Sequence, residues 1–209
     1  MRTRVKVCGM TRAEDIAAAA AHGADAIGLV FYPPSPRFLS IPKARDLRAT
    51  VPAFVSTVAL FVNATPAEVE RVIAEVRPDL LQFHGEETPR FCRHFGVPYV
   101  KACRVRPGVD LLEYLSDFPD AAGWMADSHV DAYGGTGTTF DWSVIPERRE
   151  RPLVLSGGLE QNNVREAIRR VRPWAVDVSS GVESAKGIKD AAKIAAFIAE
   201  VQNANVRPA

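Results

Sequence analysis

A thiol and a carboxyl group stand at the ends of two short β-branched segments of the sequence. Cys8 ends the first such segment, and Asp127 ends the sixth. A thiolate can remove a proton and a carboxylic acid can donate one, so this pair suits an acid–base reaction. Side chains alternate along a strand, which puts Cys8 on the face opposite Val5 and Val7. If the valines pack against helices, the thiol points toward a site on the other face.

Both residues also have a plainer interpretation. Cys8 could be a small core residue, because cysteine is often fully buried, and Asp127 could cap a helix. If Cys8 is functional, it would gain thiolate character from the N-terminus of the next helix, which Thr11 could cap. The glycine-rich loop 134–140 after Asp127 could close over a substrate, or it could be a plain connection.

Two later segments end in small residues that suit an anion. Ser156-Gly157-Gly158 follows the seventh segment, and Ser179-Ser180-Gly181 follows the eighth. Small residues let backbone N–H groups approach a phosphate closely, and a helix N-terminus adds its dipole. One Gly-Gly pair is usually only a turn, but two such loops in succession predict a phosphate site. The predicted phosphate-binding residues are Gly157, Gly158, Ser180 and Gly181.

Further polar residues could hold the rest of a substrate. Arg37 lies in a loop that three prolines stiffen, and its planar guanidinium suits a carboxylate, although it could equally be a surface arginine. Gln82 and His84 close the fourth segment, and a lone histidine there is more often structural or a minor contact. The candidate substrate-binding residues are Arg37, Gln82, His84 and Asp177. No set of residues has metal-ligand spacing, so we expect neither a metal nor another cofactor.

Eight strand-like segments must position these residues, and helical patterns separate them. Successive segments start roughly 20 to 30 residues apart, the length of a strand and a return helix. A helix is predicted over Arg12–His22, closed by Gly23, another begins at the capping-box sequence 65–68, and the last runs from about Asp190 to Val201, before a frayed tail. The predicted strands are Arg4–Cys8, Ala26–Phe31, Ser56–Val62, Leu80–Phe83, Tyr99–Cys103, Gly123–Asp127, Leu153–Ser156 and Ala175–Val178.

This alternation could fold as a closed (β/α)₈ barrel or as an open doubly wound sheet. No Gly-x-Gly-x-x-Gly follows the first strand, as a dinucleotide-binding sheet would require. Residues capable of chemistry end nearly every strand, and only a barrel gathers all eight strand ends around one mouth. We therefore expect one domain over residues 1–209, folded as a single TIM barrel.

Composition excludes several other classes of protein. The chain has 26 Lys and Arg against 25 Asp and Glu, a net charge of +1, which gives no general reason to expect nucleic acid or a membrane surface as a partner. Its three cysteines do not form a disulfide pattern, in keeping with a reducing cytosol. No signal region or membrane span is evident. We expect a cytoplasmic protein that acts on a small phosphorylated molecule.

Taken in order along the chain, these motifs resemble those of the phosphoribosylanthranilate isomerase family. The matching segments are Lys6–Thr11, Asp25–Gly28, Phe31–Tyr32, Ser35–Arg37, Leu81–Gly85, Gly134–Gly137, Phe140–Trp142, Ser156–Leu159 and Asp177–Glu183. The resemblance implies an enzyme of tryptophan biosynthesis that performs an Amadori rearrangement of N-(5'-phosphoribosyl)anthranilate. It further implies that Cys8 is the general base, that Asp127 is the general acid, and that Arg37 holds the anthranilate carboxylate.

Two alternatives stay open on sequence alone. A related barrel, the aminoaldose isomerase of the histidine pathway, would be expected to carry a carboxylate at the end of strand one, where this chain has Cys8. A barrel that only binds a phosphorylated ligand would need no acid–base pair. Turnover of the aminoaldose would separate these possibilities.

Overall fold

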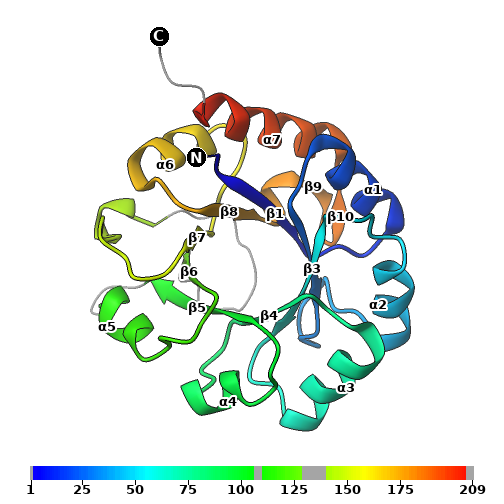
Figure 1. The fold of residues 1–209 in the computed structure, drawn as a ribbon. Coiled ribbons are helices and arrows are strands. Elements are labelled where there is room, and N and C mark those ends of the chain that lie inside the picture. Colours follow the sequence, from blue (N-terminus) through cyan, green and yellow to red (C-terminus); the bar gives the residue numbers. More distant parts are fainter. Residues whose placement is uncertain (1, 106–109, 129–139, 206–209) are drawn as a thin grey trace.

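Eight parallel strands close into a barrel in the computed structural model, with helices around its outside (Figure 1). The structure describes residues 2–105, 110–128 and 140–205. The strands follow one another around the barrel in chain order, and the first pairs with the last, for example Val5 with Val176. The predicted (β/α)₈ barrel is confirmed.

All eight predicted strands form, and each starts at the predicted residue. The fifth and sixth run on past their predicted ends because they pair with each other there, Arg104 with Asp127 and Val105 with Ser128. The strands are β1 (Arg4–Cys8), β2 (Ala26–Val30), β3 (Ser56–Phe61), β4 (Leu80–Phe83), β5 (Tyr99–Val105), β6 (Gly123–Ser128), β7 (Leu153–Leu155) and β8 (Ala175–Val178).

Helices follow most of the strands, and between β6 and β7 the described residues contain only a 3₁₀ turn. The helices are α1 (Ala13–His22), α2 (Ile41–Arg48), α3 (Pro66–Val76), α4 (Pro89–Arg93), α5 (Leu111–Ser116), α6 (Val164–Val171) and α7 (Ala191–Asn205). Two 3₁₀ turns, η1 (Trp142–Val144) and η2 (Ser180–Val182), and a small hairpin of β9 (Glu183–Ala185) and β10 (Ile188–Lys189) complete the fold. No helix in the described part of the chain is long and apolar enough to cross a membrane.

Two predicted helix boundaries are confirmed in atomic detail. At the start of α3 the Thr65 hydroxyl accepts from Glu68 N, and the Glu68 carboxylate accepts from Thr65 N, which completes the capping box. At the end of α1, Gly23 takes a left-handed φ of +98° and donates its N–H to Ala19 O and Ala20 O. The glycine is needed there because other residues adopt that φ at a cost.

Two other expectations about helix ends are wrong. Thr11 does not cap α1, whose N-cap is Arg12; its hydroxyl instead donates to Gly187 O in the turn of the β9–β10 hairpin. Helix α7 runs to Asn205 instead of ending near Val201. The Asn205 side chain accepts from Thr3 N and Oγ1 and donates to Val201 O, so the last turn is tied to the first residues of the chain.

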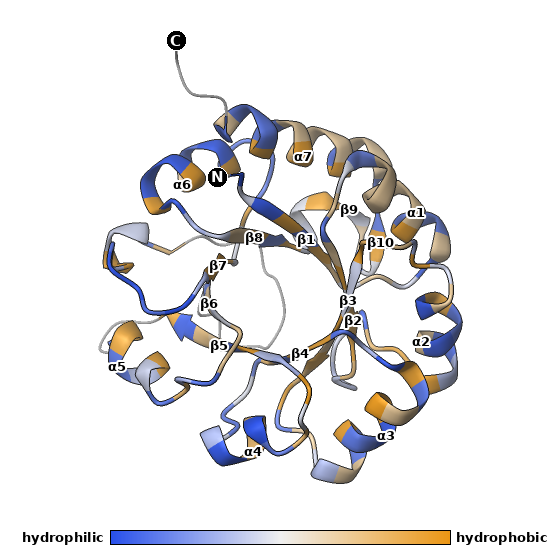
Figure 2. Ribbon diagram, in the orientation of Figure 1, coloured by the Kyte–Doolittle hydropathy of each residue, from blue (hydrophilic) through white to orange (hydrophobic). Residues whose placement is uncertain are grey.

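The hydrophobic core lies between the barrel and its helices, and a smaller apolar cluster fills part of the barrel interior. Val5 and Val7 belong to the outer core, as their alternation on β1 predicts. The inner cluster contains Val100, Ala102 and Met125. Figure 2 shows hydrophobic residues along the strands, while the helices carry both hydrophobic and hydrophilic residues. Most of the polar inward-facing positions lie nearer the carboxyl ends of the strands, where with Val30 and Leu60 they form the site described next.

Candidate active site

A cavity opens at the carboxyl ends of the barrel strands, with about 720 Å³ of space that is partly open to solvent. Nine of the ten residues singled out in the sequence line it: Cys8, Arg37, Gln82, His84, Asp127, Gly157, Gly158, Asp177 and Ser180. Gly181 does not. A Cβ at Gly181 would lie 2.1 Å from Leu159 O, so this glycine lets the loops after β7 and β8 touch.

Strand β1 brings Cys8 into the cavity. Because side chains alternate, Lys6 and Cys8 point into the barrel while Val5 and Val7 face the helices. The neighbouring strand leaves room for the thiol, since a Cβ on Gly28 would lie 2.6 Å from Cys8 Sγ. The thiol therefore stands in the wall of the cavity and is not enclosed in the core.

Buried cations act on the thiol from two strands. Burial raises the pKa of the Cys8 thiol, and the charges of Lys6 and Lys189 act in the opposite direction by favouring the thiolate. Lys6 Nζ also donates to Asp177 Oδ1 at 2.9 Å within the barrel. Burial likewise raises the pKa of Asp177, although Lys6 opposes that shift. Cations from β1 and β10 thus favour a thiolate at Cys8 against the effect of burial, and the contribution expected from the N-terminus of α1 stays a prediction.

Asp127 belongs to a hydrogen-bonded series that starts on β4. Gln82 Nε2 lies 2.9 Å from His84 Nδ1, and His84 Nε2 lies 2.8 Å from Asp127 Oδ2. A histidine with its hydrogen on Nε2 would accept from the Gln82 amide at Nδ1 and donate to Asp127. Asp127 Oδ1 accepts from Ser128 N at 2.9 Å. Both oxygens are therefore held, and the carboxyl group has one orientation in the cavity.

The loop after β7 has a conformation that requires its two glycines. Gly157 and Gly158 have φ of +89° and +65°, in the left-handed region. A Cβ on Gly157 would also lie 2.7 Å from Asp127 Oδ1, so the loop packs directly against the acid. Asn163 donates to Gly158 O at 2.8 Å, which orders the turn that leads into α6.

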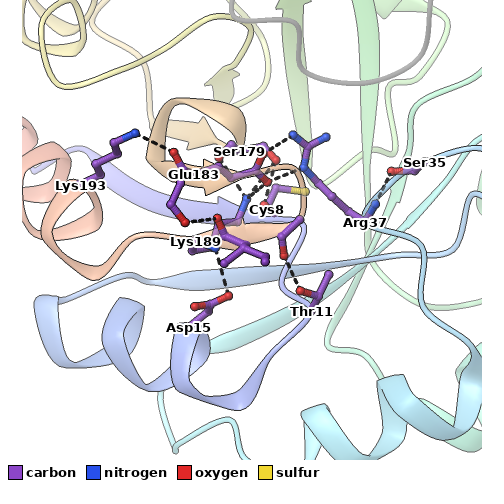
Figure 3. A network of polar contacts seen from close by, with 12 residues as sticks. Cys8, Thr11, Asp15, Ser35, Arg37, Ser179, Glu183, Lys189 and Lys193 are labelled. Carbon is purple, nitrogen blue, oxygen red and sulfur yellow. Dashed lines mark hydrogen bonds and ion pairs between the residues drawn. The ribbon is translucent and has the colours of Figure 1, made fainter.

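Arg37 is buried, so its interpretation as a surface residue is wrong. Its Nε and Nη2 each lie 2.7 Å from a carboxylate oxygen of Glu183, which makes a bidentate ion pair (Figure 3). The guanidinium is therefore already bound along one edge. Nη1 and the second hydrogen of Nη2 form the edge that stays available to a ligand. The stem of Arg37 crosses Gly9, where a Cβ would lie 2.3 Å from Arg37 Cδ.

Lys189 joins this ion pair to the strand that carries the thiol. Its ammonium donates to Glu183 Oε1 at 2.9 Å and to Ser179 O at 3.0 Å, and Ser179 Oγ donates to Cys8 O at 3.0 Å (Figure 3). Burial acts to raise the pKa of Glu183, but the hydrogen bond from Arg37 and the charge of Lys189 outweigh it and lower that pKa. Glu183 is thus held as a carboxylate between two cations.

Metal ligands were not expected. Within the described residues, no group of three or more His, Cys, Asp or Glu side chains could hold a metal ion. The glycine-rich loop 134–140, expected to connect two elements or to close over a substrate, falls outside the described residues except for Phe140.

A sequence model of one family, described as N-(5'-phosphoribosyl)anthranilate (PRA) isomerase, matches residues 5–200. The chain belongs to this family. Among similar curated proteins, the N-(5'-phosphoribosyl)anthranilate isomerase of Dechloromonas aromatica (strain RCB) is 56% identical over 206 residues, which cover 98% of this chain and 99% of that protein. The isomerase of Leptothrix cholodnii is 54% identical over 99% of this chain and 94% of its own length.

Solved structures of phosphoribosylanthranilate isomerases have the same fold. The enzyme from Thermotoga maritima has a TM-score of 0.89 at 42% identity, over 96% of this chain and 99% of that one. Another structure, with a TM-score of 0.86 at 40% identity over 96% and 99% of the two chains, is a complex with reduced 1-(o-carboxyphenylamino)-1-deoxyribulose 5-phosphate. The family expected from the motifs is therefore confirmed, and that relative binds a phosphorylated carboxylate.

Sequence reasoning missed three charged residues around this phosphoribosylanthranilate isomerase site. Lys6 stood only at the start of a recognised motif, although the alternation that brings Cys8 into the cavity also puts the Lys6 ammonium inside the barrel. Glu183 stood in a recognised motif without a role. Lys189 lies in a hairpin whose strands are only three and two residues long, which is too short to show a periodic sequence pattern. No sequence signal links Lys189 to Arg37, because the hairpin β9–β10 brings them together only in three dimensions.

Proposed function

We propose that this phosphoribosylanthranilate isomerase uses Cys8 and Asp127 as its proton-transfer pair. Its reaction is the Amadori rearrangement of N-(5'-phosphoribosyl)anthranilate to 1-(2-carboxyphenylamino)-1-deoxyribulose 5-phosphate in tryptophan biosynthesis. The observation that carries the proposal is a thiol and a carboxyl group that line one cavity from β1 and β6. A pair held on rigid strands can act on two atoms of one bound sugar.

The chemistry assigns a different step to each group. Asp127 donates a proton to the furanose oxygen, the bond from that oxygen to C1 breaks, and the nitrogen lone pair forms the C1=N bond of a Schiff base. Cys8 then takes the proton from C2, and the electrons of that bond give an enolamine that becomes the ketone. One proton is given and one is taken, so the product is an isomer of the substrate. Each positioned proton transfer typically contributes about 10² to 10⁴ in rate.

The two anionic ends of the substrate would be held on opposite sides of these groups. The loops with Gly157, Gly158 and Ser180 would bind the phosphate through backbone N–H groups, and Gly181 would support them by letting the loops touch. Arg37 would bind the anthranilate carboxylate through its free edge. Gripping the inert ends of a substrate orients the reacting carbon atoms between base and acid.

The remaining polar residues would support the acid Asp127 and the base Cys8. Gln82 and His84 would set the orientation of Asp127 through their hydrogen bonds. Asp177 would hold Lys6 beside the thiol through its ion pair, so that the cation can favour the thiolate. We also propose that residues 1–209 form one domain, that the protein works in the cytoplasm, and that it has neither nucleic acid nor a membrane as a partner.

A turnover assay with two substrates tests this function. The purified protein should isomerise N-(5'-phosphoribosyl)anthranilate, followed by loss of anthranilate-type fluorescence, and should leave the aminoaldose of histidine biosynthesis unchanged. Turnover of the aminoaldose alone would assign the protein to the histidine pathway. Turnover of neither substrate would leave a barrel that binds phosphorylated ligands without catalysis.

A further inference from the structure

We propose that Glu183 and Lys189 are positioning residues that aim Arg37 and set the charge of the subsite for the substrate carboxylate. This proposal rests on the proposed function, in which Arg37 binds the anthranilate carboxylate. In this proposal, two side chains from the segment after β8 help to recognise the substrate carboxylate, which loop 31–38 would otherwise bind alone.

The geometry of the ion pair leaves Arg37 with one usable edge. A guanidinium has five N–H donors in a planar fork, and Glu183 takes one hydrogen from Nε and one from Nη2. The end of the fork, formed by Nη1 and Nη2, still offers two parallel hydrogen bonds, which is the arrangement that suits a carboxylate. Because Arg37 lines the cavity, fixing its inner edge on Glu183 directs this outer edge toward the ligand.

Glu183 is itself held from two further directions (Figure 3). Lys189 donates to its Oε1 at 2.9 Å, and Lys193 from α7 donates to its backbone oxygen at 2.7 Å. Its side chain is only 6% exposed, and that of Lys189 is fully buried. A carboxylate held in this way cannot follow a moving arginine, so Arg37 is aligned before a ligand arrives.

The charges in the cluster explain why a lysine accompanies the pair. Glu183 alone would neutralise Arg37 and would repel an incoming carboxylate. Lys189 contributes a second positive charge, so the two cations and one carboxylate sum to +1. By contrast, Lys6 and Asp177 in the same barrel balance each other one to one. A single negative charge on the substrate would complete the cluster, and charges interact more strongly in such buried surroundings than in water.

The test compares two substrates that differ only in the carboxylate. For each variant, kcat/KM is measured with N-(5'-phosphoribosyl)anthranilate and with N-(5'-phosphoribosyl)aniline, and their ratio is the carboxylate selectivity. This ratio does not depend on the fraction of folded enzyme, so a loss of stability does not change it. A group misplaced by about 1 Å can cost up to about a hundredfold in rate.

Glu183→Gln keeps the size of the side chain but replaces one acceptor oxygen with an amide that faces a cation. We expect its carboxylate selectivity to fall about ten- to a hundredfold. Arg37→Ala should show a similar fall. The double variant should be no less selective than Arg37→Ala alone, because Glu183 acts through Arg37.

Lys189→Gln removes the extra positive charge and leaves the Arg37–Glu183 pair in place. It should also lower carboxylate selectivity, and it decides the question if Glu183→Gln does not fold.

Glu87→Gln is the matched control. Glu87 is similarly buried and ion-paired with a lysine, Lys101, but it does not line the cavity. This control should keep the wild-type selectivity even if it is less stable.

The outcomes separate this inference from the function on which it rests. Wild-type selectivity in both Glu183→Gln and Lys189→Gln, with a fall in Arg37→Ala, would overturn the positioning role and leave the proposed function intact. Wild-type selectivity in Arg37→Ala would remove both the role of Arg37 and this inference. Absence of turnover in the wild-type protein would refute the proposed function itself.

Discussion

Removing the ammonium of Lys101 should destabilise the barrel more than the loss of an ordinary surface charge. Lys101 lies on β5 and is wholly buried. Its Nζ donates to Glu87 Oε2 at 2.8 Å and to Gly85 O at 2.5 Å. The same carboxylate accepts from the backbone N–H groups of Asn63 and Gly85. The ion pair therefore ties β5 to the loops that follow β3 and β4.

Lys101→Met keeps most of the side-chain volume and leaves Glu87 as a buried carboxylate without its cation. Breaking such a pair from one side costs about 3 to 5 kcal/mol. For a domain of this length, each kcal/mol shifts Tm by about 2 to 4 °C, so Tm should fall by about 6 to 20 °C. Thermal unfolding followed by circular dichroism measures the fall in Tm, and in urea unfolding the midpoint should fall while the m-value should not change.

The double variant Lys101→Met/Glu87→Gln is the control for this interpretation. A neutral glutamine oxygen can still accept from Gly85 N, and no unpaired charge stays buried. The double variant should therefore be more stable than the sum of the two single effects predicts, by about 1 to 3 kcal/mol. A loss below about 1 kcal/mol in Lys101→Met, or strictly additive effects, would refute the reasoning.

Four further outcomes are expected. Cys8→Ser should lower kcat at least about a hundredfold, because a hydroxyl is a poorer base; near wild-type turnover would make the thiol structural. Asp127→Asn should lower kcat with little change in affinity for a product analogue, whereas a loss confined to affinity would make this residue a binding group. Because burial raises the pKa of Cys8 and the thiolate is the active base, kcat/KM should rise as pH increases above neutrality; Lys6→Met should move that rise to higher pH, and an unchanged profile would contradict the role of the lysine. Thr65→Ala removes a capping box and should cost about 1 kcal/mol in urea unfolding; equal stability would show that the cap contributes nothing.

Periodicity and residue type were sufficient to predict the barrel. Eight strands alternate with helices because β-branched runs and amphipathic runs alternate in the sequence, and each pattern has its own period. Thr65 and Gly23 mark helix ends through local hydrogen bonds and a local φ, which depend on neighbours in sequence alone. Cys8 and Asp127 could be singled out because they end strands, and a barrel brings all strand ends to one mouth.

The predictions that were wrong depended on partners distant in sequence. Thr11 looked like a helix cap, but its hydroxyl bonds to Gly187, 176 residues away. Arg37 could have been a surface arginine, but it is buried against Glu183, which is 146 residues away. Helix α7 looked shorter because Asn205 is stabilised by Thr3, 202 residues away. A local sequence pattern cannot reveal such contacts, because each of these residues is compatible with its local structure whether or not the distant partner is present.

The pairing of β1 with β8 has a consequence for how this protein is made. Cys8 and Arg37 leave the ribosome early, whereas Asp177, Ser179, Glu183 and Lys189 come from the last part of the chain. A nascent chain that stops before β8 can form several neighbouring strand pairs, but it lacks the β1–β8 pairing and three of the five charged residues around the thiol, namely Asp177, Glu183 and Lys189. Activity would therefore appear only once the ring has closed, which makes turnover a direct report on closure of the barrel.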